Sequence, residues 1–243
     1  MVNLRTLEKS FFLLMNMHCT KWVIVFAILF ISYGSSHAQS QFIGLGESAL
    51  SVNHKVSPFY TIHFALETRC FLYQDEVILL KQQQLDFAHF STFNLNYNYS
   101  LSLGVEYRHR DAFETGHDEL RITEQFNYKI KTLGKRYGHR FRSEQRLLKD
   151  KTIFRNRYRF AIDFPLNGEK LDIGEAYLVN STEGLLSLSE TAKPECDFRI
   201  SSQIGWKINN KLKFQTGLEY RFEAFNLQTE HRLFVLTSAV FKI

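Results

Sequence analysis

The chain has 243 residues, a formal net charge of +5, 15% aromatic residues, 12 glycines and 3 prolines. Its length allows one domain or at most two, and its high aromatic content excludes an intrinsically disordered chain. The basic excess is too small to indicate a protein that binds nucleic acid. No shift in composition marks a linker, so we expect one folded domain.

The first part of the chain has the order of a secretory signal peptide. An apolar run at 22–33 follows Lys21 and precedes a stretch of small residues that ends at Ala38. The run is shorter than the roughly 20 apolar residues that a membrane-spanning helix needs. We therefore expect cleavage after Ala38, with a leader and signal peptide at 1–38 and a single β domain at 39–243. Cleavage would lower the net charge to about +3.

After the signal peptide, almost every segment alternates apolar and polar residues with period two. No segment repeats apolar residues at helical spacing for long enough to indicate a helix. The sequence therefore predicts an all-β domain. Its regular segments, in chain order, are 60–70, 85–101, 101–107, 120–130, 137–146, 154–164, 198–206, 212–222 and 233–243, with a less regular stretch at 177–188.

These segments suit strands that cross a membrane. They make about eleven strands of roughly ten to thirteen residues, longer than the five or six of soluble sheets and enough for a tilted crossing of about 9 to 11 residues. Because single-chain bacterial barrels have an even strand number, we predict an antiparallel up-and-down transmembrane β-barrel of ten or twelve strands. Either 42–52 is then not a wall strand, or a further strand lies within 171–190. Short turns are expected at 98–100, 132–135 and 209–210, and longer outer loops at 111–119, 149–152, 189–195 and 223–230.

The charged residues indicate which side of the sheet meets lipid. An arginine facing lipid near the midplane costs about 2 to 4 kcal/mol, so several would exceed the roughly 5 to 15 kcal/mol by which a typical fold is stable. We therefore expect the charges inside a closed, Arg- and Glu-rich lumen and the aromatic residues outside. The predicted lumen charge network is Glu67, Arg69, Glu106, Arg108, Arg121, Arg140, Arg142, Glu144, Arg155, Arg157, Arg159, Glu219 and Arg221.

In a narrow lumen these charges must pair, because an unpaired buried charge is strongly destabilising. We expect Arg155, Arg157 and Arg159 to form ion pairs across the interior. Their predicted partners are Glu106, Glu144 or Glu219. The interior is then either a packed polar plug or an arginine-lined passage or cradle for an anion, and any specificity is expected in longer loops such as 111–119.

The sequence carries no strong catalytic or metal-binding motif in the mature chain, which predicts a protein that is not an enzyme and has no cofactor. The alternative is an outer-membrane lipid hydrolase or acyl transferase with a histidine and a serine facing lipid. Its candidate residues are His89 with Ser91, His109 with His117, and His139 with Ser143, although histidines of loops or aromatic belts explain them more simply.

The expected location is the cell outer membrane, with outer-membrane lipid and, through the last strand, the barrel-assembly machinery as partners, and no nucleic acid. The main alternative is a soluble periplasmic β-barrel or β-sandwich that binds a ligand. Its apolar face would be internal and its charges would lie in water. The length of the strands and the aromatic residues along every one of them favour the membrane barrel.

A pentapeptide occurs twice in similar form, as Gly104-Val105-Glu106-Tyr107-Arg108 and Gly217-Leu218-Glu219-Tyr220-Arg221. Each copy follows a short turn that contains asparagine. We interpret the repeat as the same hairpin sequence pattern occurring twice. The alternative is a duplicated functional site.

The later part of the chain resembles a known family. The order is Arg155-Asn156-Arg157-Tyr158-Arg159 with Pro165, then Tyr177 and Glu183, then Arg199 with Gly205 and the Gly217–Arg221 strand. It resembles the domain-of-unknown-function family 2490, exported proteins regarded as outer-membrane barrels, and the resemblance covers roughly 41–243. It implies a barrel fold but supplies no activity, ligand or catalytic residue. The chain departs from many barrels in ending on Phe241-Lys242-Ile243 rather than on an aromatic residue, which weakens the expected assembly signal.

Overall fold

The structure is a computed structural model that describes residues 42–243. The predicted leader and signal peptide at 1–38 lies outside these residues. Among the described residues, no helix is long and apolar enough to cross a membrane.

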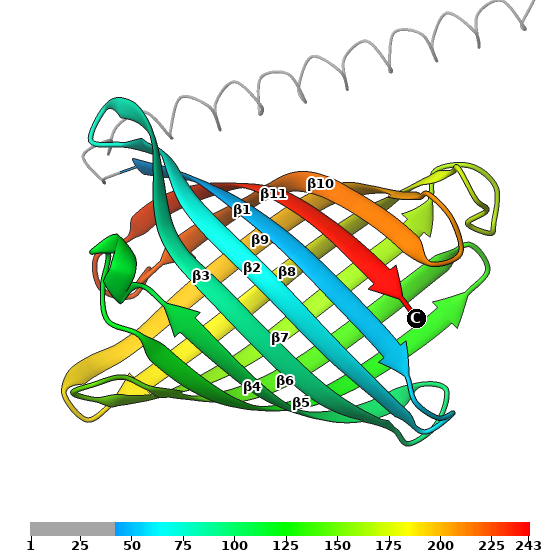
Figure 1. Cartoon of the computed structure of the whole chain (residues 1–243), viewed down its shortest axis with the longest axis horizontal. Coiled ribbons are helices and arrows are strands. Elements are labelled where there is room, and N and C mark those ends of the chain that lie inside the picture. Colours follow the sequence, from blue (N-terminus) through cyan, green and yellow to red (C-terminus); the bar gives the residue numbers. More distant parts are fainter. Residues whose placement is uncertain (1–41) are drawn as a thin grey trace, which may run out of the picture. The chain divides into compact units, whose positions relative to one another are not determined.

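The described chain forms one closed β-barrel (Figure 1). Each strand pairs with the next one in the sequence, and the last strand pairs with the first. The predicted all-β closed barrel is thereby confirmed. The elements are β1 (Phe42–Lys55), β2 (Tyr60–Gln74), β3 (Val77–Asn94), β4 (Tyr99–His109), the 3₁₀ helix η1 (Asp111–Phe113), β5 (Glu119–Thr132), β6 (Lys135–Leu147), β7 (Thr152–Pro165), β8 (Ala176–Ser189), β9 (Ala192–Lys207), β10 (Leu212–Glu223) and β11 (Glu230–Lys242).

The strand number is eleven, so the prediction of ten or twelve was wrong. Both doubtful segments, β1 and β8, are wall strands. Successive strands run antiparallel, and an odd number therefore makes the first and last strands run in the same direction. The barrel accordingly closes through a parallel pair, β1 with β11, in register from Phe42 opposite His231 to Asn53 opposite Lys242. The even-number rule assumes antiparallel closure, which this fold does not use.

The wall places apolar side chains outside and polar side chains inside. On β4, Leu103 is 58% exposed, whereas its neighbour Ser102 is 4% exposed. Successive strand residues point to opposite faces, so the alternation in the sequence becomes two chemically different surfaces. The largest fully buried side chains include the polar residues Gln84, Asp86, Glu119, Thr123 and Glu144.

The connections differ in part from those expected. The longest, 166–175 between β7 and β8, lies at the barrel end for which short turns were predicted. Its backbone is tied to the β9 end, because Gly174 N–H donates to the Lys207 carbonyl. The predicted long loop at 189–195 is only a two-residue turn, since the rest of that segment extends β9.

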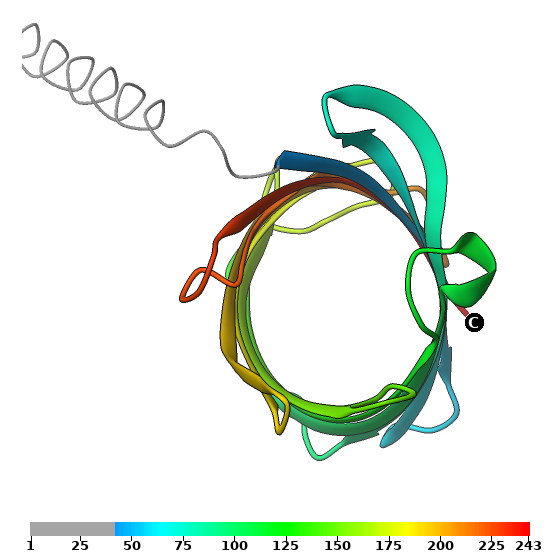
Figure 2. The same ribbon diagram turned by 90° about the vertical axis from the view of Figure 1, so that its left-hand side faces the viewer.

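The β2–β3 hairpin is longer than predicted and leans away from the barrel wall at its tip (Figure 2). Asp75 and Glu76 form its turn, and both have positive φ angles of 50° and 63°. Two successive residues in this region are typical of a type I′ hairpin turn, whose twist matches that of the strands. The sequence 71–84 therefore continues two strands rather than forming a loop.

Candidate functional site in the lumen

The inward faces of the strands line a cavity of about 510 Å³. All residues of the predicted lumen network except Glu144 line it. Glu144 is 1% exposed and pairs with Arg142 and Arg157, which do line the cavity. The barrel thus brings the predicted set of residues together on one inner surface.

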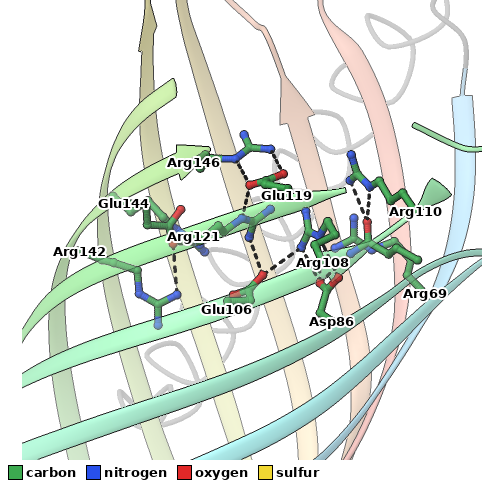
Figure 3. A network of polar contacts seen from close by, with 12 residues as sticks. Arg69, Asp86, Glu106, Arg108, Arg110, Glu119, Arg121, Arg142, Glu144 and Arg146 are labelled. Atoms are coloured by element: carbon green, nitrogen blue, oxygen red, sulfur yellow. Dashed lines mark hydrogen bonds and ion pairs between the residues drawn. The ribbon is translucent and has the colours of Figure 1, made fainter. Parts of the chain in front are cut away.

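A first group of ion pairs crosses the strands β3 to β5 (Figure 3). Arg108 on β4 donates from Nε and Nη2 to the two oxygens of Asp86 on β3, at 2.9 and 2.6 Å. Arg121 on β5 donates to Glu106 on β4 at 2.8 Å. Two-pronged contacts between arginine and carboxylate are among the strongest charge-assisted hydrogen bonds. These pairs therefore hold neighbouring strands together from the inside.

Glu119 extends this group to β6. Its carboxylate accepts from Arg146 Nε and Nη2 at 2.6 and 2.9 Å and also contacts Arg121. Glu119 falls at the end of a loop predicted from the sequence and was therefore not included in the predicted network. Its spacing of two from Arg121 was the available signal, because residues two apart on a strand share a face.

A second group is centred on Glu183 of β8. This carboxylate accepts from Arg157 at 2.7 Å and from Arg140 at 2.9 Å, and it lies 3.8 Å from Arg199. Arg157 also donates to Glu144 at 2.9 Å. One carboxylate therefore serves three guanidinium groups, which leaves local positive charge in excess.

A third group lies beside the closing strands. Glu47 on β1 accepts from Arg69 at 2.6 Å and lies 3.7 Å from Arg221. Arg221 also donates to Glu219 at 2.5 Å. In both copies of the repeated pentapeptide, the glutamate and arginine thus point into the lumen and pair with each other, as Glu106 does with Arg108 at 3.4 Å.

Arginines dominate one row of the inner wall, which we call the arginine row. Its members are successive cross-strand neighbours on β6 to β11. Among the described residues, the buried Nε atoms of four of its arginines, at 140, 159, 199 and 232, have no hydrogen-bond partner. The row reads Arg140, Arg159, Glu183, Arg199, Arg221 and Arg232.

The three arginines singled out on β7 behave differently from one another. Arg157 pairs with Glu144, one of its predicted partners. Arg155 instead lies 3.9 Å from Glu195 and Asp197 and donates to Ser187 at 2.8 Å. No carboxylate of the described chain lies within ion-pair distance of Arg159. The pairing predicted for Arg155 and Arg159 was therefore wrong. Glu144 lies opposite Arg155 and Glu183 opposite Arg159, but both carboxylates pair diagonally with Arg157 instead.

Several lumen residues were not predicted as members of the network. Except for Arg110, which follows β4, they occupy the polar positions of the alternating pattern in their strands. That alternation was the signal that could have identified them. Some lie on β1 and β8, the strands that the sequence left in doubt. The missed residues are Glu47, Asp86, Arg110, Glu119, Arg146, Glu183, Glu195, Asp197, Arg199, Glu223 and Arg232.

The histidine and serine pairs considered for catalysis lie outside the lumen. His89 and Ser91 are outward neighbours on β3, with His89 Nε2 3.2 Å from Ser91 Oγ, but the buried Nδ1 of His89 has no partner among the described residues. His139 bonds to Tyr158 rather than to Ser143. Within residues 42–243, no cluster of three or more side chains could hold a metal ion.

His109 ends β4 and His117 lies in the loop that contains η1, and each is beside a different aspartate. The Asp118 carboxylate accepts from His109, from the Tyr107 hydroxyl and from the backbone N–H groups of Arg110 and Asp111. These hydrogen bonds, with that of Tyr107 the largest, hold the pKa of Asp118 well below its usual range. The loop is therefore organised around one carboxylate and not around a pair of histidines.

The sequence also matches a family profile over residues 48–231, from within β1 to the start of β11. That profile is described as "Protein of unknown function (DUF2490)". The chain belongs to this family. The match spans nearly the whole DUF2490 barrel and confirms the resemblance found in the sequence. No curated protein matches the chain.

Among solved structures, two forms of OmpT from Vibrio cholerae resemble this DUF2490 chain. The in-vitro folded outer membrane protein OmpT in its trimer form has 9% identity and a TM-score of 0.41, over 68% of this chain and 54% of OmpT. A loop L8 deletion mutant of OmpT has 10% identity and a TM-score of 0.40, over 68% and 56%. The chain spans little more than half the length of OmpT, and this likeness transfers no property of OmpT to it.

Proposed function

We propose that the protein is an outer-membrane β-barrel whose narrow, arginine-lined lumen accepts small anions. The membrane placement is supported by the outer surface, where apolar side chains are exposed along every strand. Exposed apolar surface on this scale marks contact with lipid or with other proteins. A soluble barrel would carry these side chains inside and its charges in water.

Strand length and aromatic rows support the same placement. β5 has 14 residues, about 46 Å at roughly 3.3 Å per residue, and at a typical tilt of about 40° it would rise about 35 Å. This exceeds the roughly 30 Å of a hydrocarbon core. Outward aromatic residues form one row near each end of the barrel, as in the girdles of membrane barrels. The rows are Tyr99, Tyr128, His139 and Phe160, and Phe198, Phe222, His231 and Phe42.

The arginine row carries the proposal for the lumen. It holds five guanidinium groups and one carboxylate, and Arg159 and Arg199 are its least compensated members. Buried polar groups normally find hydrogen-bond partners, so donors without acceptors inside a charged cavity favour an anionic guest. Rings of arginine select anions in pores.

Fractionation tests the membrane placement. The full chain, expressed in a Gram-negative host, should appear in the outer-membrane fraction and show heat-modifiable mobility in detergent gels. Recovery as a soluble periplasmic protein would refute this placement and favour the ligand-binding alternative.

Planar bilayers test the lumen. The purified protein should give small, anion-selective conductance steps, and Arg159→Glu with Arg199→Glu should abolish or invert the selectivity. Lys170→Glu, which reverses one positive charge in the exposed 166–175 connection, should change the selectivity little. Cation-selective steps from the unmodified protein, or no conductance from heat-modifiable protein, would contradict an anion passage, and the second result would favour the plug.

We propose no catalytic role for this barrel. Incubation of the purified protein with phospholipid or lipopolysaccharide should release no fatty acid, because within residues 42–243 no group hydrogen-bonds to Nδ1 of His89 and orients its ring. Release that disappears in Ser91→Ala would contradict this expectation.

A further inference from the structure

Three polar side chains interrupt the apolar outer surface on β5, β6 and β7. Glu124 lies opposite Ser143, and Ser143 lies opposite Asn156, so the three form one short outward row. All three are exposed. Within the described residues, none of their side chains makes a hydrogen bond. We call these residues the outer polar row.

The outer polar row lies in a groove of about 600 Å³ with apolar borders. On one side, Phe93, Leu101, Phe126 and Phe141 are successive cross-strand neighbours and form a continuous ridge. Two residues away on the other side, the wall carries mainly apolar side chains. Apart from Gln145, apolar side chains therefore border the outer polar row on both sides. The residues of the second border are Val105, Ile122, Gln145 and Phe154.

Glu124 occupies the middle of the apolar band. It is four residues from Tyr128, in the aromatic row at one end, and four from Leu120 near the other end of β5. Within residues 42–243, no other Asp, Glu, Lys or Arg lies on the outward side of the wall away from the strand ends. An ionisable residue at such a depth is energetically unfavourable in lipid and indicates a functional contact.

The outer polar row contains both hydrogen-bond donors and acceptors, so two copies of the row can bond to each other. The Glu124 carboxyl group is an acceptor, whereas the Ser143 hydroxyl and the Asn156 amide can donate. Copies inserted in one membrane share the same orientation. A two-fold axis along the membrane normal therefore places each residue at the same depth in both copies. Such an axis sets the two rows against each other, so that acceptors and donors are present on both sides of the contact.

We propose that the groove over β5, β6 and β7 is a docking surface for a second copy of this chain, with the two outer polar rows bonded to each other inside the membrane. This inference rests on the membrane placement proposed above. The aromatic ridge of each copy, formed by Phe126 and Phe141 at its centre, packs against the groove of the other. The contact removes both carboxyl groups from lipid.

Cysteine cross-linking in intact outer membranes tests the contact. In a chain with Cys70→Ser and Cys196→Ser, which removes the free cysteines of the described residues, Ser143→Cys should form a disulfide-linked dimer on oxidation. The matched control is Ser48→Cys, an exposed outward serine of β1 on the far side of the barrel, which should stay monomeric.

A second variant tests the chemistry of the contact. Glu124→Leu, added to the Ser143→Cys chain, should lower the dimer fraction about tenfold or more, because hydrogen bonds to a charged group are lost from both sides. The barrel should keep its heat-modifiable mobility, because leucine suits a lipid-facing position. Glu124→Gln, which keeps an acceptor, should retain more of the dimer.

Three results would overturn the docking proposal. These are a Ser143→Cys chain that stays monomeric in the outer membrane, equal cross-linking of the Ser48→Cys control, and a cross-linked product with a different protein or a mass other than twice that of the chain. Fractionation of the same samples separates the two proposals. Protein in the soluble fraction refutes the membrane placement, whereas uncross-linked protein in the membrane refutes only the docking surface.

Discussion

Leu45 and Phe234 face each other across the parallel strand pair that closes the barrel, and both side chains are fully buried. The Arg221 guanidinium lies 3.6 Å from the centre of the Phe234 ring, and that of Arg69 lies 5.0 Å from it. An apolar contact covered by two cations thus stands inside an otherwise charged lumen. Stacking of arginine on a ring adds a cation–π attraction, so this contact strengthens the barrel at its closure.

Phe234→Ala should therefore destabilise the barrel by about 3 to 5 kcal/mol, the range for removing a buried phenylalanine. Urea unfolding of the detergent-solubilised protein, followed by the fluorescence of Trp206, measures this loss. Phe214→Ala on the outer face of β10 is the control and should cost less, because detergent replaces the lost contact. Equal losses for the two variants would refute the role of Phe234 in the closure of the barrel.

Glu183→Gln should cost about 3 to 5 kcal/mol, the range for breaking a buried ion pair by removing one partner. The substitution leaves Arg140, Arg157 and Arg199 without their shared charge. The same unfolding assay measures the effect. Glu190→Gln, in the exposed β8–β9 turn, is the matched control and should change stability little. A Glu183→Gln barrel as stable as the unmodified protein would show that the arginines are compensated elsewhere.

Gly205→Ala should destabilise the barrel by about 1 to 3 kcal/mol, the usual cost of overpacking. Gly205 lies directly opposite Tyr177, and a Cβ atom there would overlap the ring. Displacing the ring also disturbs the 2.7 Å hydrogen bond from Gln215 to the Tyr177 hydroxyl. Gly184→Ala, where a Cβ meets nothing within 4 Å, should not be destabilising. Thermal unfolding measures the stability of both variants, and equal stability of Gly205→Ala and Gly184→Ala would contradict the prediction.

The loop at 110–118 should stay ordered in mild acid. The folded pKa of Asp118 is lowered by its hydrogen bonds, from Tyr107 first. Its stabilising contribution is therefore present above the unfolded pKa of about 3.9 and is lost only as the pH falls through the lower folded value. Trypsin cleavage after Arg110 should consequently remain slow at pH 5, compared with Asp118→Asn. The control is Asp150→Asn in the 148–151 connection, and cleavage of Asp118→Asn no faster than this control would contradict the role of Asp118.

The sequence by itself determined the two faces of the wall. Alternation is a local property, because each strand residue points to the side opposite its neighbours. The positions of Arg108, Arg121 and Arg157 on the polar phase were therefore sufficient to group them on one surface. β8 was less regular for a local reason as well: its outward residues include Asn180, Thr182 and Gly184, so its two faces differ little in polarity.

Only the tertiary structure decided how the barrel closes and which charges meet. The parallel contact of β1 with β11 joins opposite ends of the chain, and a period of two carries no information about such a distant pairing. Register sets Arg155 opposite Glu144 and Arg159 opposite Glu183. The side-chain conformations nevertheless bring Arg157 against both carboxylates, and within the described residues no carboxylate lies within ion-pair distance of Arg159. Glu124 shows the same limit, since its polarity is visible in the sequence, whereas its isolation in an apolar band appears only when β4 to β7 lie side by side.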